Sequence, residues 1–309
     1  MKTAPIILFV YNRPLHTQQT INALLKNTLS AESTLIVYSD GPKLHANDDV
    51  KKVRDYLKSI KGFKETKIIE RSENWGLAKN IIEGVTETLQ EYDRTIVLED
   101  DLVTSPYFLT YMNQALELYQ DESKVASIHG YIYPTTEHLS DTFFLLGADC
   151  SGWGTWRRAW NFFEPDGKKL LKKLRDQNLC HKFDYNGSYP FTKMLKDFTN
   201  GRNNSWAVRW YASAFLENML TLYPGKSLIQ NIGMDGSGTH CGETDILDTE
   251  ISTNPVLMEK LDIKENPRER VIIATALKST NIRLSKMVAK KLLFIAKNLA
   301  KKFTFSRDL

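Results

Sequence analysis

The chain has 309 residues, 42% of them hydrophobic and 25% charged, which is enough for a substantial core and excludes a disordered or collagen-like protein. Its 41 basic and 37 acidic residues give a net charge of only +4, so the overall charge identifies no partner. The basic excess is local, because the segment 283–302 carries seven Lys or Arg residues and no acid, and this asymmetry indicates an anionic partner there.

The cysteine pattern argues against both a disulfide framework and a zinc knuckle. The cysteines Cys150, Cys180 and Cys241 are widely spaced, odd in number and without a C-x-x-C pair. They favour a reducing, cytoplasmic location. The start of the chain does not have the pattern of a signal peptide, and no stretch reaches the roughly 20 apolar residues that span a bilayer. We therefore expect a protein that is not integral to a membrane.

Short apolar runs alternate with helical patterns over the first hundred residues. Strands are predicted at residues 5–10, 35–38, 66–69 and 95–98, and helices at 16–26, 48–60 and from the 72–76 loop through Leu89. This βαβαβαβ order predicts an α/β fold with a mainly parallel sheet that helices cover on both faces. Ligands bind such sheets at the carboxyl ends of the strands. Those ends carry the polar groups Tyr11-Asn12-Arg13, Asp40-Gly41, Glu70-Arg71 and Glu99-Asp100-Asp101.

The second half of the sequence is harder to interpret. Helices are predicted at 106–119, 167–177 and 205–220, a polar segment at 186–204 and a last strand at 227–232. The region 128–160 is rich in glycine and aromatic residues and shows no clear period.

Adjacent aspartates directly follow the apolar strand 95–98. Core packing does not explain them, since carboxylates are rarely buried without a partner. Asp100 and Asp101 suit a hard divalent cation, Mn²⁺ or Mg²⁺, which keeps several waters and bridges to substrate phosphates. A pair of exposed turn residues is the alternative, and the strand before them favours the functional interpretation.

Several motifs resemble one known group of enzymes. The run I-V-L-E-D-D-L-V-T-S-P-Y-F-L is similar to the metal-binding acidic motif of GT-A glycosyltransferases, in the form found in N-acetylglucosaminyltransferase I and its bacterial relatives. F-V-Y-N-R-P and Y-S-D-G-P-K resemble the first two strand ends of glycosyltransferase family 2, and E-N-W-G-L-A-K-N resembles its N-x-G-x-x-x-x-N segment. The resemblance covers about residues 3–241 and implies a GT-A, Rossmann-like nucleotide-diphospho-sugar transferase fold.

The resemblance also implies a division of the chain. A catalytic domain would occupy residues 1–245, with a nucleotide-sugar-binding half at 1–101 and an acceptor-binding half at 102–245. A connecting segment at 246–280 would lead to a basic amphipathic helix at 281–309, with apolar residues at spacings of three or four. That helix is expected to attach to an anionic inner membrane surface, and packing on the catalytic domain is the alternative.

The resemblance assigns roles to individual residues. Asp101 would ligate the metal and Asp100 would contact the ribose or a metal-bound water. The other expected donor-binding residues are Tyr11, Arg13, Asp40, Asn74, Gly76, Lys79 and Trp153. For Asp40 the alternative is a capped Asp-Gly-Pro turn, for Arg13 a solvated turn cation, and for Lys79 a solvent-facing helical residue.

The second half would complete the site. His240 follows a Gly-Ser-Gly-Thr loop and is expected to reach the metal or diphosphate. Arg209, between two tryptophans, would stabilise leaving-group charge. Relatives often have an acid just before the helix predicted from Ser205, where this chain reads Asn203-Asn204, so the base is sought in Asp235, which we favour, or Asp149.

The sequence thus predicts an enzyme that transfers a sugar from a UDP- or GDP-sugar to a glycan or lipid-linked acceptor, by inversion, in surface polysaccharide synthesis. A sugar nucleotidyltransferase is the first alternative, but it would need an early glycine-rich phosphate loop. A non-catalytic carbohydrate-binding protein is the second. Nucleic acid is not an expected partner, because no basic aromatic groove accompanies the tail.

Overall fold

A computed structural model describes residues 2–43, 47–236 and 244–305, with the backbone alone for residue 47 and residues 287–305. Its first hundred residues have the predicted order of strands and helices. The strands are β1 (Ile6–Val10), β2 (Thr34–Ser39), β3 (Glu65–Glu70) and β4 (Arg94–Glu99). The helices between them are α1 (Pro14–Leu25), α2 (Asn47–Leu57) and α3 (Leu77–Glu91), with a short 3₁₀ turn, η1 (Ser30–Glu32), before β2. The predicted βαβαβαβ pattern is confirmed.

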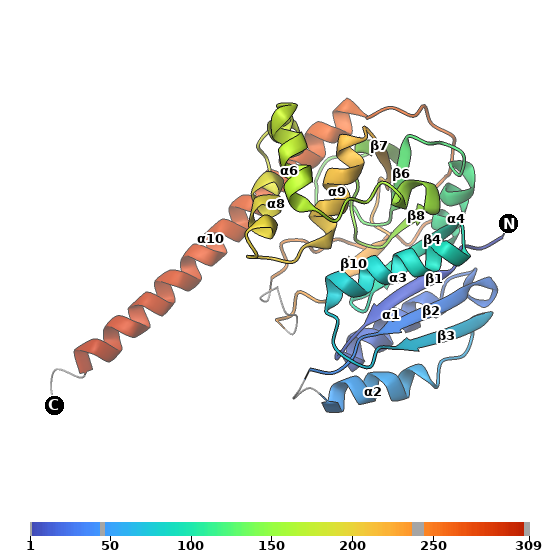
Figure 1. Ribbon diagram of the computed structural model, residues 1–309, viewed down its shortest axis with the longest axis horizontal. Coiled ribbons are helices and arrows are strands. Elements are labelled where there is room, and N and C mark those ends of the chain that lie inside the picture. Colours follow the sequence, from blue (N-terminus) through green and yellow to red (C-terminus); the bar gives the residue numbers. More distant parts are fainter. Residues whose placement is uncertain (1, 44–46, 237–243, 306–309) are drawn as a thin grey trace.

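One eight-stranded sheet runs through the molecule in the order β3-β2-β1-β4-β8-β6-β9-β7 (Figure 1). Its second half adds β6 (Val125–His129), β7 (Thr142–Leu146), β8 (Trp153–Trp156) and β9 (Leu220–Pro224). The first four strands are mutually parallel and β6 is parallel to β9, whereas β8 lies antiparallel between β4 and β6, and β7 is antiparallel to β9. The sheet is therefore mainly parallel, as predicted.

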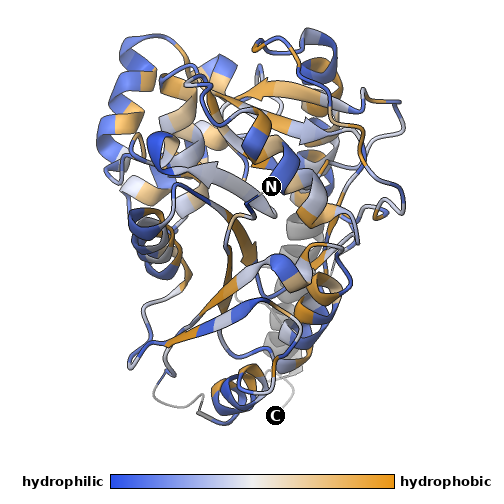
Figure 2. Ribbon diagram, turned by 90° about the vertical axis from the view of Figure 1, so that its right-hand side faces the viewer, coloured by the Kyte–Doolittle hydropathy of each residue, from blue (hydrophilic) through white to orange (hydrophobic). Residues whose placement is uncertain are grey.

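Side chains of the central strands alternate between two apolar layers. Ile6 and Leu8 of β1 share a core with α1, α2 and α4 (Phe108–Leu118), whereas Ile7 and Phe9 share the other with α3 and α9 (Trp206–Leu216). Successive side chains of a strand point to opposite faces, so a continuously apolar strand needs helices on both. Several strands of the sheet are largely orange in Figure 2, and hydrophobic and hydrophilic residues alternate along the helices.

A two-stranded ribbon joins the end of β4 to the late part of the chain. β5 (Leu102–Thr104) pairs antiparallel with β10 (Ile229–Asn231), and Asn231 lies opposite Leu102. The residues after β10 are therefore brought directly to the acidic end of β4.

The structure differs from the sequence prediction in the second half. The segment 186–204 contains the helix α8 (Phe191–Thr199), whose Leu195 is fully buried, and it packs with α6 (Gly167–Asp176). The helix predicted to reach residue 220 ends at Leu216, because Asn218 takes a positive φ of 52° and the chain then enters β9. The region without a clear period forms strands β7 and β8 and the short helix α5 (Arg157–Trp160); a further short helix, α7 (Cys180–Phe183), precedes α8.

The C-terminal helix α10 (Pro267–Phe305) begins well before the predicted boundary at 281. Its first turns belong to the body of the protein, since Ile273 and Leu277 are 0% and 2% exposed. Beyond them the helix continues away from the body as a single rod (Figure 1). No helix among the described residues is long and apolar enough to cross a membrane.

Candidate active site

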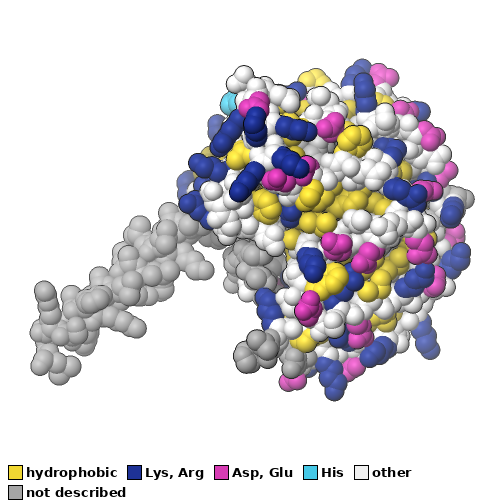
Figure 3. Space-filling model, viewed as in Figure 1, with side chains coloured by type: hydrophobic (Ala, Val, Ile, Leu, Met, Phe, Trp, Pro, Cys, Tyr) yellow, Lys and Arg dark blue, Asp and Glu magenta, His cyan; other side chains and the backbone are white. Residues whose placement is uncertain are grey.

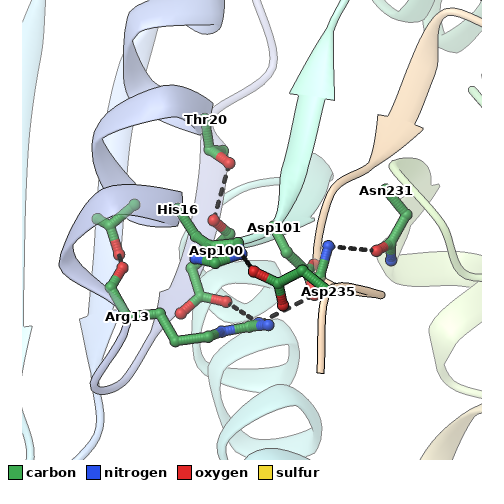
Figure 4. A network of polar contacts seen from close by, with 9 residues as sticks. Arg13, His16, Thr20, Asp100, Asp101, Asn231 and Asp235 are labelled. Carbon is green, nitrogen blue, oxygen red and sulfur yellow. Dashed lines mark hydrogen bonds and ion pairs between the residues drawn. The ribbon is translucent and has the colours of Figure 1, made fainter. Parts of the chain in front are cut away.

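The acidic end of β4 meets the loop between β1 and α1. A single guanidinium nitrogen of Arg13 donates to both carboxylates, to an Oδ1 of Asp100 and, at 2.9 Å, to an Oδ2 of Asp101 (Figure 4). The hydroxyl of Thr20 on α1 donates to the backbone carbonyl of Asp100 at 2.8 Å. Because β1 and β4 are adjacent parallel strands, their carboxyl ends bring Arg13 and the two aspartates together.

This strand end carries more negative charge than one guanidinium neutralises. Burial and the charges of Asp101 and Asp100 raise the pKa of Glu99 to about 8. Burial also raises the pKa of Asp100 to about 6, although Arg13 opposes the shift. Burial alone would lower the pKa of Arg13, but the two aspartates outweigh it and raise that pKa. The cluster can therefore accept further positive charge.

The chain after β10 closes over the acidic residues. The backbone N–H of Ile232 donates to the carbonyl of Asp101 at 2.9 Å, and that of Gly233 donates to the side chain of Asn231 at 2.8 Å (Figure 4). A Cβ on Gly233 would lie 2.1 Å from Oδ2 of Asp101, so only glycine fits this approach. Two residues on, Asp235 lies 3.2 Å from Nε2 of His16.

Asp40, at the end of β2, has a different environment. Its Oδ1 accepts from the backbone N–H groups of Gly41 and Trp75, and its Oδ2 from the N–H of Gly76 and the side-chain amide of Asn74, all within 3.0 Å. A carboxylate has about four acceptor positions, and protein donors fill all of them. The structure thus favours the capping alternative over contact with a base or ribose.

The predicted residues near Asp40 divide into two groups. Asn74 and Gly76 hold the loop through that carboxylate. The ammonium of Lys79 and the guanidinium of Arg71 lie over the ring of Trp75, 4.0 and 3.9 Å from its centroid. Arg71 and Trp75 lay outside the predicted donor set, and their spacing along the chain gave no sign of this stack.

A family model described as "Glycosyl transferase family 2" matches residues 6–194, which is more than half of the chain. The chain belongs to glycosyltransferase family 2. The expected GT-A fold is confirmed, and the protein is a glycosyltransferase. Enzymes of this fold commonly use a divalent metal ion.

Solved structures of several sugar transferases are distantly similar. One is the mannosyltransferase PcManGT from Pyrobaculum calidifontis in complex with GDP-Man and Mn²⁺, with 11% identity and a TM-score of 0.31 over 43% of this chain and 36% of that one. A second is a protein provisionally named a nucleotide-diphospho-sugar transferase from Desulfovibrio desulfuricans G20, with 12% identity and a TM-score of 0.35 over 68% of this chain and 99% of that one. A third is TarS of S. aureus, with 15% identity and a TM-score of 0.29 over 45% of this chain and 24% of that one. The chain thus spans about a third of the first and a quarter of the last. A search of curated proteins gave no match.

The acidic residues of this glycosyltransferase fit a divalent metal ion in part. Asp100 and Asp101 offer the hard oxygen ligands that Mn²⁺ and Mg²⁺ bind, at a cluster with unneutralised negative charge. Within the described part of the chain, no three His, Cys, Asp or Glu side chains form a metal-binding group by themselves. Further ligands would come from water, substrate phosphates or His240, which lies outside the described residues.

Two predicted site residues lie elsewhere. Trp153 is 1% exposed and packs against Trp160, Trp206 and Trp210, so its ring belongs to the core between the sheet and α9 and presents no face to a ligand. Trp153 is the first residue of β8. Successive side chains of a strand point to opposite faces of the sheet, and the Trp153 ring points to the face that α9 covers.

Arg209 is also enclosed within the second half. Its guanidinium donates to the carbonyls of Ser205 and Pro165 and lies 4.3 Å from the ring centroid of Phe198. Among the residues that the structure describes, these partners all lie in the second half and away from the network around Asp101. The side chain stabilises the start of α9 instead.

Three residues of the network were missed by sequence reasoning. His16, Thr20 and Gly233 all contact the acidic cluster or the segment that covers it. His16 and Thr20 are one turn apart on α1, so they share a helix face, but nothing in the sequence says that this face meets β4.

Proposed function

We propose that this glycosyltransferase moves a hexosyl or N-acetylhexosaminyl group from a UDP- or GDP-sugar to a glycan or lipid-linked acceptor of a surface polysaccharide, with inversion. The observation that supports the proposal most strongly is the cluster of Arg13, Asp100 and Asp101 at the carboxyl end of a buried parallel strand. Both signs of charge are needed there, since a diphosphate must be bound and a cation held beside it.

Each residue of the cluster has a distinct task in this proposal. Asp101 holds Mn²⁺ or Mg²⁺, with His240 as a second candidate ligand, and Asp100 contacts the donor ribose or a metal-bound water. When bound, the metal ion neutralises charge on the departing diphosphate. Arg13 contacts the diphosphate, and Tyr11, whose hydroxyl accepts from the N–H of Lys43 at 3.3 Å, lies between the first two strand ends beside the nucleotide. Trp75, with Lys79 and Arg71 on its ring, offers an aromatic and cationic surface beside this position.

The decisive experiment is a binding and hydrolysis screen of UDP- and GDP-sugars with and without Mn²⁺. We expect one donor to bind in a metal-dependent manner and to be hydrolysed slowly in the absence of acceptor. The control is Asp176→Asn, an exposed carboxylate on α6 paired with Lys172, which should behave as wild type. If no sugar nucleotide binds, and Asp101→Ala changes nothing, the proposal is wrong.

We also propose peripheral attachment to an anionic membrane surface, in which residues 281–303 take part. The described surface supports this. The exposed basic side chains of α6 are Lys168, Lys169, Lys172, Lys173 and Arg175. They gather with those of α8 on the side from which α10 leaves the body (Figures 1 and 3). Each basic residue near an anionic surface adds about 1 kcal/mol of binding.

Vesicle co-sedimentation tests the attachment. Vesicles that contain phosphatidylglycerol should bind the full chain, and vesicles of phosphatidylcholine alone should not. Replacing Lys290, Lys291 and Lys297 by Glu should release it at physiological salt, whereas the same change at Lys58, Lys61 and Lys64 in the first half should not. Equal binding by the two variants would contradict the membrane proposal.

A further inference from the structure

A small cavity in the second half has a carboxylate among aromatic side chains. It measures about 80 Å³, and its lining includes Asp149, Cys150, Tyr133, Tyr185, Tyr211 and Tyr223. A single water molecule requires only about 10–15 Å³ of such space, so the cavity has room for the edge of a larger polar group. Aromatic faces with a few fixed polar groups are the usual surroundings of a bound sugar ring.

The carboxylate of Asp149 is held in one orientation. Its Oδ2 accepts from the hydroxyl of Tyr133 at 2.6 Å and lies 3.5 Å from that of Tyr223, and its Oδ1 accepts from the N–H of Cys150 at 2.8 Å. The imidazole of the fully buried His129 lies 3.8 Å from Oδ1. Even so, 22% of the Asp149 side chain is exposed, and Asp149 is one of the residues that line the cavity.

The sheet places this cavity beside the acidic end of β4. Residues 149–152 lead directly into β8, which pairs with β4 so that Trp153 lies opposite Val97. Burial, followed by the charges of Asp149 and Glu99, raises the pKa of the Cys150 thiol, so both carboxylates are near enough to this residue to act on it. Arg13 and His16 follow β1, on the other side of β4. The segment with Asp149 and the loop with Arg13 thus adjoin the two strands that flank β4, which are β8 and β1.

That arrangement separates the two candidates for the base. Asp235 contacts His16 on the Arg13 side and follows a segment bound to the carbonyl of Asp101, so it lies with the proposed metal and diphosphate. In an inverting transfer the acceptor attacks the face of the sugar opposite the leaving diphosphate, and its proton must be taken there. Asp149 adjoins β8, on the far side of β4 from Arg13 and His16, which favours it over Asp235 for this task.

We propose that the cavity around Asp149 is the subsite for a hydroxyl-bearing ring of the acceptor, and that Asp149 is the catalytic base. This inference rests on the proposed function. The acceptor hydroxyl gives its proton to the Asp149 carboxylate while its oxygen forms the bond to the anomeric carbon. The bond from that carbon to the diphosphate oxygen breaks, and its electron pair leaves with the nucleoside diphosphate. Tyr133 is a positioning residue, because its hydroxyl fixes the oxygen of Asp149.

The test compares donor binding with transfer. The probes are the sugar nucleotide and Mn²⁺ from the screen, and p-nitrophenyl glycosides as soluble acceptors. Asp149→Asn should bind donor and Mn²⁺ within about 2-fold of wild type while its kcat for transfer falls by about 10²–10⁴-fold, the usual contribution of a general base. The matched control is Asp235→Asn, which by this proposal retains transfer better than Asp149→Asn does.

Two further variants probe the cavity without removing the carboxylate. Ala207→Leu, at the first turn of α9 on the cavity wall, should raise the acceptor KM and leave donor affinity unchanged. Tyr133→Phe should lower kcat and shift the pH profile of transfer, which a purely structural role would not do.

The outcomes separate the two proposals. A folded Asp149→Asn variant that transfers at the wild-type rate, or loses donor binding, would overturn this inference. If Asp149→Asn fails to fold, an unchanged acceptor KM in Ala207→Leu would overturn it instead. A wild-type chain that binds no sugar nucleotide would contradict the proposed function itself.

Discussion

The ends of β2 and β4 carry aspartates that look alike in the sequence but differ in their partners. Asp40 follows β2 and accepts four hydrogen bonds, one from the next residue, Gly41, and three from the loop after β3; three of the four come from backbone N–H groups. Asp101 follows β4, and its side-chain partner in the network is Arg13, at 2.9 Å. A carboxylate that the backbone has saturated fixes a loop, whereas one that pairs with a single side-chain cation can exchange that partner for a ligand.

The difference shows that position at a strand end does not by itself assign a residue to ligand binding. Parallel strands end at one edge of the sheet, which explains why both aspartates lie there. Their tasks depend on the next few residues, because the loop after β3 supplies donors to Asp40 and the segment after β10 lies against Asp101.

The largest expected effect is loss of stability on changing Asp40. Asp40→Asn replaces an accepting oxygen by an amide that faces N–H donors, so two donors lose their partner in a site that is 5% exposed. The free energy of unfolding should fall by about 4 kcal/mol, from roughly 2 kcal/mol for each unsatisfied donor. Urea denaturation followed by circular dichroism measures it. An unfolding free energy within 1 kcal/mol of wild type would show that Asp40 does not have this structural role.

The opposite result is expected at Asp101. Asp101→Asn should lower transfer by about 10²–10³-fold, which is about 3–4 kcal/mol of transition-state stabilisation, and abolish the response to Mn²⁺. Its stability should stay within about 1 kcal/mol of wild type, because loss of the Arg13 pair is offset by reduced repulsion from Asp100. Steady-state kinetics measures the transfer rate, and Mn²⁺ titration by electron paramagnetic resonance measures metal binding. Unchanged Mn²⁺ affinity would argue against Asp101 as a ligand.

The contrast also explains how far the sequence could predict this site. Apolar runs and helical periods gave the first four strands, and parallel topology then required Arg13 and Asp101 to meet. Saturation of Asp40 depends on the orientation of the N–H groups of Trp75 and Gly76, which no residue pattern records. A structural role is one of the two interpretations that the sequence allows for Asp40, and nothing in the sequence selects it.

The second half was less predictable because its contacts are non-local. Strands β7 and β8 pair antiparallel with β9 and β4, which are far away in the sequence. Their own short apolar runs show no recognisable period. Trp153 resembles a ligand-stacking residue in sequence and is a core residue in the structure. Only the pairing of β5 with β10 brings Gly233 to Asp101.

A smaller effect on activity should follow when the close contact between Gly233 and Asp101 is blocked. Gly233→Ala places a methyl group against Oδ2 of Asp101 and must displace the segment or the carboxylate. We expect donor turnover to fall by about 10-fold, or about 1.4 kcal/mol. Gly201→Ala is the control, since its φ of +70° strains an alanine but its Cβ meets nothing within 4 Å. The control should lose about 1 kcal/mol of stability and keep its activity. Equal turnover by the two variants would show that the Gly233 contact does not matter.

Modest effects are also expected at two tryptophans, one in the core and one beside the strand ends. Trp153→Phe should cost about 1–2 kcal/mol of stability through lost packing and leave the donor KM unchanged, because its ring is 1% exposed among other tryptophans. Trp75→Phe should do the reverse, with little loss of stability and a donor KM raised several-fold, since its half-buried ring lies between Arg71 and Lys79. Thermal melts and donor titrations of both variants measure this. A raised KM in Trp153→Phe alone would restore the stacking role that the sequence suggested.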